Sequence, residues 1–221
     1  KHWNYTKEDQ SSSEFNASVV VAVRNRHEAL KVFLTSCIIV NGISEIVVVD
    51  WGSDVPVASW LHNHPAKGMV KLLRVTNEPE YVLTRAYNLG FSFCTHDVIL
   101  KIDADVVVVH TNFLELHWPR PGEFYRCSWE DAGANENARH LNGVVILRRS
   151  DLARSRGYDE RLQSYGYDDT EFYGRLQSLG LTERTINLHH LHHIPHSDNL
   201  RATASAAVEL NGGRGSNSSS W

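Results

Sequence analysis

The sequence predicts an α/β protein, a single domain with a mostly parallel central sheet flanked by helices and a smaller, mixed C-terminal half. Short apolar runs such as Val19–Val23 alternate with amphipathic stretches over the first half of the chain. Runs without polar positions are typical of strands buried on both faces, and their alternation with helices is typical of right-handed parallel crossovers. A length of 221 residues with 42% hydrophobic content suits one domain with a substantial core.

The first half is predicted to contain four strands with helices between them. The helix that starts at His27 is expected to end at the Asn41-Gly42 pair, because glycine readily takes the left-handed conformation that closes a helix. The other predicted elements are strands at 19–23, 45–50, 69–75 and 97–103, a short helix within 51–65 and a helix over 84–94.

In the second half, two predicted strands, 123–127 and 142–149, follow each other without a helix between them. A short helix over 150–157 comes next. The last predicted helix, 168–180, begins with Asp168 as N-cap and Glu171 three residues later, the spacing of a capping box, and Gly180 is expected to close it.

The composition excludes several classes of protein. With 22 basic and 26 acidic residues the net charge is -4, so no bulk positive field is present to bind nucleic acid. No apolar run reaches the roughly 18 residues that span a bilayer. Three cysteines far apart predict neither a disulfide scaffold nor a cysteine zinc site. Acceptor sequons for N-glycosylation at Asn4, Asn16 and Asn217 favour a secreted or luminal protein.

Charged residues follow the predicted parallel strands at the point where each strand ends. Arg24 and Arg26 follow the first strand, Asp50 ends the second, and Asp103 and Asp105 follow the fourth. The carboxyl ends of parallel strands meet at one edge, which is where open α/β sheets bind ligands. In an extended chain Asp103 and Asp105 would point to the same side, about 7 Å apart, a spacing that one divalent ion and its waters bridge.

A further carboxylate stands out at the start of the last predicted helix. Asp168 and Glu171 suffice for capping, which leaves Asp169 beside Tyr165 and Tyr167 as a candidate general base facing a ring-shaped substrate. The alternative is that all three acids only stabilise the positive end of the helix.

Five histidines lie within eight residues near the C-terminal end of the predicted domain. Neutral imidazole is a good ligand for zinc or manganese-like ions, so one of these side chains is expected to complete the site of the Asp pair. A solvated, histidine-rich loop is the alternative. The five are His189, His190, His192, His193 and His196.

Several motifs together resemble the GT-A glycosyltransferases, within them the family 2 enzymes and the β-1,4-galactosyltransferase and chondroitin-polymerase group. "VAVRNR" resembles the FRNR strand end of galactosyltransferases, "VVVDWGSD" the VDNGSTD turn of family 2, "TRAYNLGF" its aRAxNxG helix and "DAD" the DxD motif. The segment from "LNGVVILRR" to "YGYDDTEFYGRL" is similar to the galactosyltransferase FGGV…WGWGGED region. The resemblance runs in order from about residue 18 to 199.

The resemblance implies a metal-dependent, inverting transfer of a sugar from a UDP-sugar to a hydroxyl of a glycan or glycoconjugate in the Golgi or secretory-pathway lumen, with Mn²⁺ or Mg²⁺ as cofactor. It implies a catalytic domain (17–210) with a nucleotide-binding half (17–110) and an acceptor-binding half (111–210). Composition predicts a polar leader (1–16) before this domain and a flexible, Gly/Ser-rich tail (211–221) after it. Carried over position by position, the implied roles are Asp169 as catalytic base; Arg24, Arg26, Asp50, Arg85 and Asp103 for the donor; Asp168 and Tyr165 for the acceptor; and Asp105 with His193 or His190 for the metal.

The chain departs from the galactosyltransferase pattern where Tyr165 stands for the Trp of WGWGG and Gly166-Tyr167 for its glycine pair. Acceptor identity therefore does not carry over. Two other functions remain open on the sequence, a non-catalytic sugar- or metal-binding module on the same fold and a sugar nucleotidyltransferase. The nucleotidyltransferase is disfavoured because "VAVRNRHEAL" lacks the glycine-rich phosphate loop that it requires.

Overall fold

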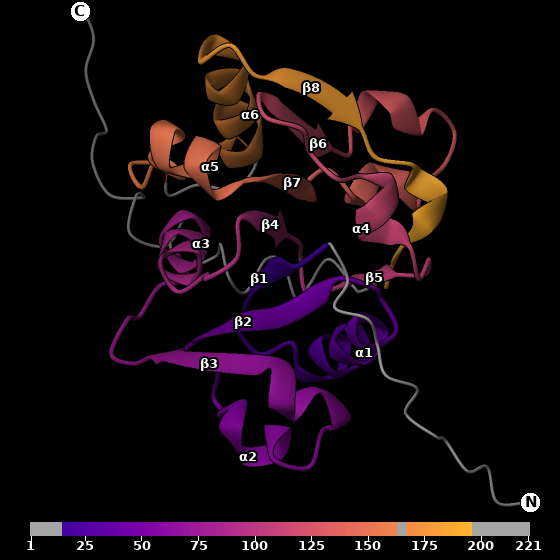
Figure 1. Cartoon of the computed structure of the whole chain (residues 1–221). Coiled ribbons are helices and arrows are strands. Elements are labelled where there is room, and N and C mark those ends of the chain that lie inside the picture. The colour runs from indigo at the N-terminus through magenta and orange to yellow at the C-terminus, as the bar shows by residue number, and fades with distance from the viewer. Residues whose placement is uncertain (1–14, 163–166, 196–221) are drawn as a thin grey trace, which may run out of the picture.

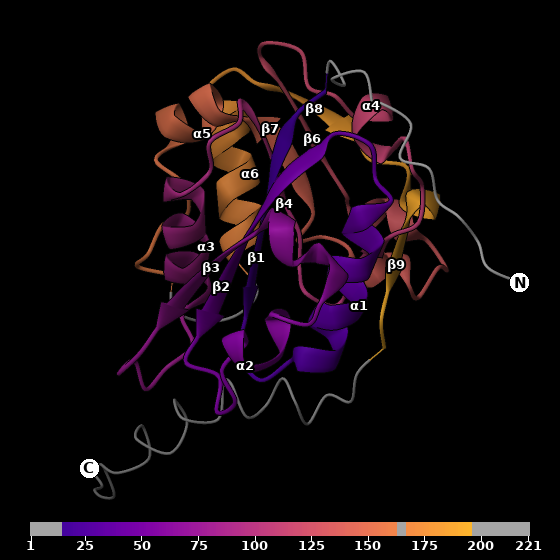
Figure 2. The same cartoon turned by 60° about the horizontal axis from the view of Figure 1, so that its bottom comes forward.

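The computed structural model describes residues 15–162 and 167–195, which form a seven-stranded sheet with helices on both faces (Figures 1 and 2). The strand order is β3-β2-β1-β4-β7-β6-β8, and β3, β2, β1 and β4 are all parallel, as predicted. Strand β7 runs antiparallel to both of its neighbours, which makes the second half mixed. The strands are β1 Ala17–Val23, β2 Ile43–Trp51, β3 Val70–Val75, β4 Val98–Lys101, β5 Val106–Val108, β6 Glu123–Arg126, β7 Val145–Arg148, β8 Thr182–Thr185 and β9 Leu191–His193.

The helices pack in two layers. The α-helices are α1 His27–Ile38, α2 Ala58–Leu61, α3 Leu83–Ser92, α4 Phe113–Leu116, α5 Arg149–Ser155 and α6 Asp168–Ser178. Figure 2 shows α3, α5 and α6 on one side of the sheet and α1 on the other. Short 3₁₀ turns cover Pro65–Met69, Glu130–Ala132, Ala138–His140 and Leu188–His190.

Strand β1 is at the centre of the core and is buried on both faces, as its all-apolar sequence predicts. Val19 and Val21 belong to the cluster that includes α1, whereas Val20 and Ala22 belong to the cluster that includes α3 and α6. Because successive side chains of a strand point to opposite faces, one run of valines joins the two helix layers.

Helix α1 ends at Ile38, earlier than predicted. The backbone N–H of Val40 bonds to the Cys37 carbonyl oxygen, and that of Asn41 bonds across to the Thr111 carbonyl oxygen. Gly42 then takes a φ of +87° in the turn that enters β2. Gly42 therefore does lie in a turn, but the helix ends before this turn because the backbone of Asn41 bonds to Thr111 instead.

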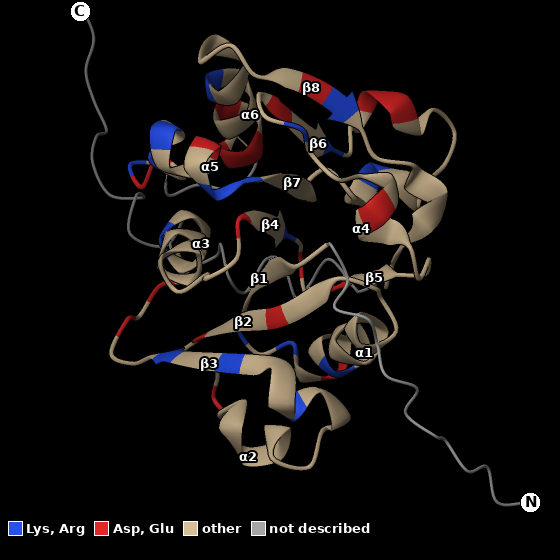
Figure 3. Ribbon diagram, viewed as in Figure 1, with Lys and Arg blue, Asp and Glu red and all other residues tan. Residues whose placement is uncertain are grey.

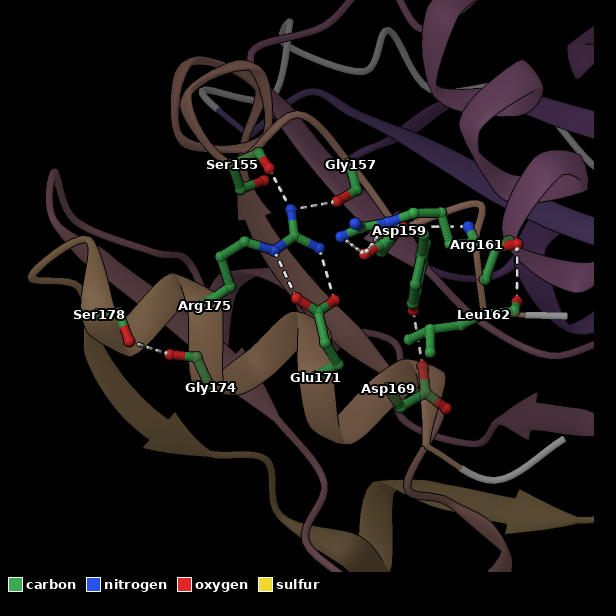
Figure 4. A network of polar contacts seen from close by, with 12 residues as sticks. Ser155, Gly157, Asp159, Arg161, Leu162, Asp169, Glu171, Gly174, Arg175 and Ser178 are labelled. Atoms are coloured by element: carbon green, nitrogen blue, oxygen red, sulfur yellow. Dashed lines mark hydrogen bonds and ion pairs between the residues drawn. The ribbon is translucent and has the colours of Figure 1, made fainter. Parts of the chain in front are cut away.

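The predicted capping box at the start of α6 is wrong. The N-cap is Tyr167, and Asp168 is already the first helical residue. The Glu171 carboxylate does not reach back, because it forms a bidentate pair with Arg175 one turn later, at 2.8 and 2.7 Å. This pair holds Arg175 against the carbonyl oxygens of Ser155 and Gly157 (Figure 4).

A two-stranded ribbon joins distant parts of the chain and was not predicted. Strand β5 pairs antiparallel with β9, with Val106 opposite His193 and Val108 opposite Leu191. Three residues are too short to give a periodic signal. The consequence is that the histidine-rich segment lies beside the segment that follows β4.

Within the described residues, no helix is long and apolar enough to cross a membrane. Cys37, Cys94 and Cys127 are buried free thiols, in agreement with the predicted lack of a disulfide scaffold.

Replacing Gly90 of α3 with alanine is expected to destabilise the fold. An ideal Cβ there would lie 2.5 Å from Val20 Cγ1 and 3.1 Å from Val49 Cγ2. Overpacking of this kind typically lowers the free energy of unfolding by about 1–3 kcal/mol. Urea unfolding measures the loss, and Val20→Ala in the same chain should recover part of it, since the smaller side chain makes room. Additive effects of the two changes would show that the close contact is not the cause.

Candidate functional site

Loops with charged residues follow the carboxyl ends of the parallel strands β2, β1 and β4 at one edge of the sheet (Figure 3). β1 is followed by Arg24–Arg26, β2 by 52–54 and β4 by 103–105. The sequence-based expectation that these segments converge is therefore correct for the backbone. The side chains within them have different partners.

Asn25 interlocks the loops that follow β1 and β2. Its backbone N–H donates to Ser53 Oγ (3.0 Å), and its side-chain Nδ2 donates to Asp54 Oδ2 (3.0 Å). Its Oδ1 accepts from the Asp54 N–H at 2.8 Å. Asn25 has a φ of 58°, in the left-handed region that asparagine tolerates better than most residues. Sequence reasoning passed over this residue, although an asparagine between two arginines at a strand end was a usable signal.

Asp50 holds the loop that follows β2, and it has no exposed surface. Its carboxylate accepts from the N–H groups of Ser53 and Val57 at 3.0 Å and from Arg74 at 2.5 Å. Burial opposes ionisation of Asp50, yet these donors hold its pKa below the usual value. The predicted contact of Asp50 with a donor molecule disagrees with this geometry, because the carboxylate is already bonded and enclosed.

The arginines expected to meet a donor lie at this edge with different partners. Arg24 donates to the Pro79 carbonyl oxygen (3.0 Å), and Arg26 pairs with Asp105. Arg85 on α3 is 3.9 Å from Glu160 in an ion pair whose side chains are 42% and 51% exposed. An open pocket of about 350 Å³ includes Pro79, the partner of Arg24, in its lining. The lining residues are Gly52, Arg74, Thr76, Asn77, Glu78 and Pro79.

Asp103 and Asp105 lie on a turn, so the prediction that they extend β4 and face the same way is wrong. β4 ends at Lys101, and the N–H of Val106 bonds to the Asp103 carbonyl oxygen at 3.0 Å. Asp103 Oδ1 accepts from Tyr87 Oη (2.7 Å) and from Lys101 Nζ (3.1 Å), whereas Asp105 pairs with Arg26. The two carboxylates therefore serve different neighbours.

The structure separates the two histidines that the sequence left as alternatives. His193 is buried on β9, with Nε2 3.9 Å from Asp105 Oδ2. His190 precedes β9 at its other end, with its ring 4.3 Å from that of His110 and 5.4 Å from that of His117. The geometry therefore brings His193 to Asp105 and places His190 in another cluster.

Of the remaining histidines of this segment, His189 and His192 are exposed. His196 lies outside the described residues. A further histidine, His140, stacks on the His193 ring at a centroid distance of 4.5 Å, and sequence reasoning did not single it out.

Asp169 projects from the first turn of α6 toward the end of β4. Its Oδ1 accepts from Tyr158 Oη at 2.6 Å and lies 3.3 Å from Lys101 Nζ. Burial raises the pKa of Asp169 to about 6; Lys101 opposes this rise, and the negative charges of Asp168 and Asp103 add to it. A carboxyl group with such a pKa exchanges protons near neutral pH, as a general base must.

The loop that carries Tyr158 is held from two sides. Asn88 of α3 donates to the Tyr158 carbonyl oxygen (2.9 Å) and accepts from the Tyr158 N–H (2.8 Å). From α6, Arg175 donates to the Gly157 carbonyl oxygen at 2.7 Å (Figure 4). Lys101, Tyr87 and Tyr158 were all missed from the sequence; a lysine inside an apolar strand was the one available signal.

The expected acceptor residues are only partly described. Asp168 is buried at the start of α6, and Tyr167 before it is 74% exposed. Tyr165 lies outside the described residues.

The donor atoms near Asp105 suit a divalent cation that is also bound by a ligand. In residues 15–162 and 167–195, no three His, Cys, Asp or Glu side chains gather closely enough to hold a metal ion by themselves. Asp105 and His193 offer one carboxylate and one imidazole 3.9 Å apart. Mn²⁺ accepts both ligand types, and ions that serve phosphate chemistry typically take few protein ligands and complete their shell with substrate phosphates and water. The pair therefore fits such an ion.

Two family models match consecutive parts of the chain. Residues 18–119 match glycosyl transferase family 2, and residues 126–197 match the N-terminal domain of galactosyltransferase. The chain is 22% identical over 183 residues to beta-1,4-galactosyltransferase 7 of human and of mouse, an alignment that covers 82% of this chain and 49% of those proteins. The chain thus spans about half the length of these curated relatives.

Solved structures share the fold at low sequence identity. A Pyrobaculum calidifontis mannosyltransferase in complex with GDP-Man and Mn²⁺ has a TM-score of 0.60 at 18% identity, over 77% of this chain and 54% of that one. The catalytic domain of Drosophila β1,4-galactosyltransferase 7 with xylobiose has a TM-score of 0.56 at 17% identity, over 85% and 73%. A variant of the same enzyme with manganese, UDP-Gal and xylobiose has a TM-score of 0.57 at 16% identity, over 92% and 82%. The predicted GT-A fold is confirmed.

Proposed function

We propose that this chain, a glycosyltransferase domain of the GT-A type, transfers a sugar from a UDP-sugar to a hydroxyl of a glycan or glycoconjugate with inversion at the anomeric carbon. One observation carries the proposal: a half-buried carboxyl group with a pKa near 6, Asp169, is linked through Lys101 to Asp103 of the "DAD" turn. A proton acceptor and a donor-side carboxylate thus meet at the edge where α/β sheets bind ligands.

The proposed donor site lies along the ends of β1, β2 and β4. Arg24 and the pocket beside it are suited to the nucleotide, with Arg26 reaching the diphosphate once it leaves Asp105. Asp103 would bond the ribose or sugar through its exposed side. Arg85 is available to the sugar or a phosphate, since its pair with Glu160 is exposed. Asp50 supports this surface from behind through Ser53 and Val57.

Asp105 and His193 would hold a Mn²⁺ or Mg²⁺ ion together with the diphosphate. When bound, such an ion neutralises the charge that develops on the leaving diphosphate. The site needs added positive charge, because Asp103, Asp105, Asp168 and Asp169 gather around Lys101 and Arg26 before a diphosphate enters.

Asp169 is the proposed general base. Its carboxylate accepts the proton of the acceptor hydroxyl while that oxygen forms a bond to the anomeric carbon. The bond from this carbon to the diphosphate oxygen breaks on the opposite side, so a single displacement inverts the configuration. Tyr158, bonded to Asp169 Oδ1, orients the carboxylate and leaves Oδ2 for the acceptor. General-base assistance typically contributes about 10²–10⁴-fold in rate.

Asp168 and Tyr165 remain the proposed acceptor contacts, and the exposed ring of Tyr167 adds a surface on which a sugar can stack. A luminal, Golgi-type location is proposed from the glycosylation sequons, of which Asn16 is exposed immediately before β1.

Release of nucleotide from a panel of sugar nucleotides tests the proposed function. UDP-galactose comes first and GDP-mannose is included, because related structures contain these two donors. We expect slow release of UDP with Mn²⁺ and faster release when acceptor glycans are added. Tight binding of a donor without any release would favour a non-catalytic module, and no binding of any donor with Mn²⁺ would contradict the proposal.

Removal of the metal is expected to abolish transfer, and Mn²⁺ should restore it. Asp105→Asn should raise the Mn²⁺ concentration needed for half-maximal activity by at least roughly 10- to 100-fold. Loss of a mere outer-shell partner already weakens a metal site by this factor. His190→Ala is the matched control, because His190 lies at the other end of β9. A metal titration of nucleotide release measures both. If His190→Ala raised the Mn²⁺ requirement as much as Asp105→Asn does, the assignment of His193 over His190 as the metal ligand would be contradicted.

A further inference from the structure

A fully buried lysine lies behind two carboxylates that the proposed reaction uses. Lys101 is the last residue of β4, and its side chain is 0% exposed, whereas those of Asp103 and Asp169 are 32% and 19% exposed. Its Nζ atom is 3.1 Å from Asp103 Oδ1 and 3.3 Å from Asp169 Oδ1. The ammonium group thus contacts both carboxylates from the core and leaves their outer surface open to ligands.

Two tyrosines complete the surroundings of this ammonium group. Tyr87 Oη donates to Asp103 Oδ1 at 2.7 Å, and Tyr158 Oη donates to Asp169 Oδ1 at 2.6 Å. Lys101 Nζ is 4.4 Å from the Tyr87 ring centroid and 5.9 Å from that of Tyr158, within the range of cation–π attraction. Each carboxylate therefore has its own tyrosine, and the two share one lysine.

A gain in stability alone does not explain why a lysine is buried here with two carboxylates. Moving a lysine and its carboxylates out of water costs several kcal/mol per ion, and well-packed apolar residues of similar volume are often as stable or more so. The neighbouring residues of β4, Ile99 and Leu100, are apolar and fully buried, so this strand accommodates aliphatic side chains readily. The partners of Lys101 lie instead on the "DAD" turn and on the first turn of α6.

We propose that Lys101 is a positioning residue that holds Asp103 and Asp169 in one fixed arrangement, so that the donor-side carboxylate and the base keep their spacing. The inference rests on the proposed function, because it takes Asp169 as the base. Lys101 itself acts only through these carboxylates. The charged and titratable groups that face Asp169 are Lys101, Asp103, Asp168, Tyr158, Tyr87 and Tyr173.

The test compares Lys101→Met, which keeps the length of the side chain without its charge, with the wild type. Loss of a cation in direct contact typically moves a carboxyl pKa upward by about 1–3 units. We therefore expect the acidic limb of kcat/KM to move to higher pH by at least about one unit, and kcat to fall more than KM for the donor rises. Lys67→Met is the control, because Lys67 is exposed on the 3₁₀ turn Pro65–Met69 and its Nζ donates to the His62 carbonyl oxygen. An unmoved limb in a folded Lys101→Met protein would overturn the inference.

A direct titration separates this inference from the proposed function. With aspartate labelled at ¹³Cγ, the Asp169 signal is assigned by its loss in Asp169→Asn, and its pKa is followed in both proteins. An upward shift in Lys101→Met supports the positioning role even if no sugar nucleotide is turned over, which would contradict the proposed function alone. An unchanged pKa overturns the inference even in an active enzyme.

If Lys101→Met alone does not fold, the double variant Lys101→Met/Asp103→Asn removes the cation together with one of its carboxylates, which relieves the unpaired buried charge. The pKa of Asp169 is then measured in this double variant by the same ¹³C titration. An upward shift is again expected, because the lysine contacts Asp169 whereas Asp103 acts on it only at longer range. A pKa that stays at or falls below the wild-type value would overturn the inference.

Discussion

Asp169→Asn is expected to lower sugar transfer by about 10²–10⁴-fold, the usual contribution of a general base. Asparagine keeps the shape of the side chain and can still accept from Tyr158, so donor binding should stay near the wild-type value. Rates of transfer, with calorimetry for UDP and Mn²⁺, measure the two effects separately. Asp159→Asn is the matched control, since Asp159 lies nearby but bonds Arg161. Wild-type transfer by Asp169→Asn would rule out this residue as the base.

The pH dependence of kcat/KM provides a second test of Asp169 as the general base. Asp169 must be ionised to accept a proton, and burial raises its pKa to about 6. Consequently kcat/KM should rise with pH through about 6 and level off above it. The reverse sign, activity lost as the pH rises through this window, would mean that a protonated Asp169 is the active form.

Gly143→Ala is expected to abolish most of the activity through Asp103. An ideal Cβ at Gly143 would lie 2.3 Å from Asp103 Oδ2 and 2.8 Å from Lys101 Nζ, so both groups must move. A displacement near 1 Å typically costs about 10²-fold in rate. The free energy of unfolding should also fall, by about 1–3 kcal/mol, because the new methyl group overpacks a buried site. Transfer rates and urea unfolding measure the two effects.

Gly174→Ala is the control for this substitution. Gly174 lies on α6, the helix that carries Asp169, and apart from its chain neighbours and the helix's own backbone no atom of the described residues lies within 4 Å of an added Cβ. Alanine there should leave transfer unchanged and stabilise the helix by about 0.5–1 kcal/mol. Comparable activity of Gly143→Ala and Gly174→Ala would show that Asp103 tolerates displacement.

The elements that the sequence predicted well are those with a strong local signal. The valine run of β1 and the other parallel strands have few alternatives to a buried sheet, and their order along the chain implies one common edge. The elements that it missed depend on long-range bonds. Asn41 bonds Thr111 and ends α1 early, and β5 with β9 gains its structure only by pairing across the fold.

The same distinction applies to the site. The carboxylates Asp103, Asp105 and Asp169 could be proposed from the sequence because acids at strand and helix ends are visible there. The expectation that Asp103 and Asp105 lie in an extended strand was wrong, since the chain turns after Lys101 and gives them different neighbours. Tyr158 was invisible because its position depends on Asn88 and Arg175 from two other helices.

The contacts made by Asn25 have a consequence for redesigning the proposed donor site. Since this one side chain joins the segments after β1 and β2, neither segment can be exchanged for that of a relative without misfitting the other. If these segments bind the nucleotide as proposed, redesign for a different base would have to transfer both together, with the asparagine and its serine and aspartate partners retained.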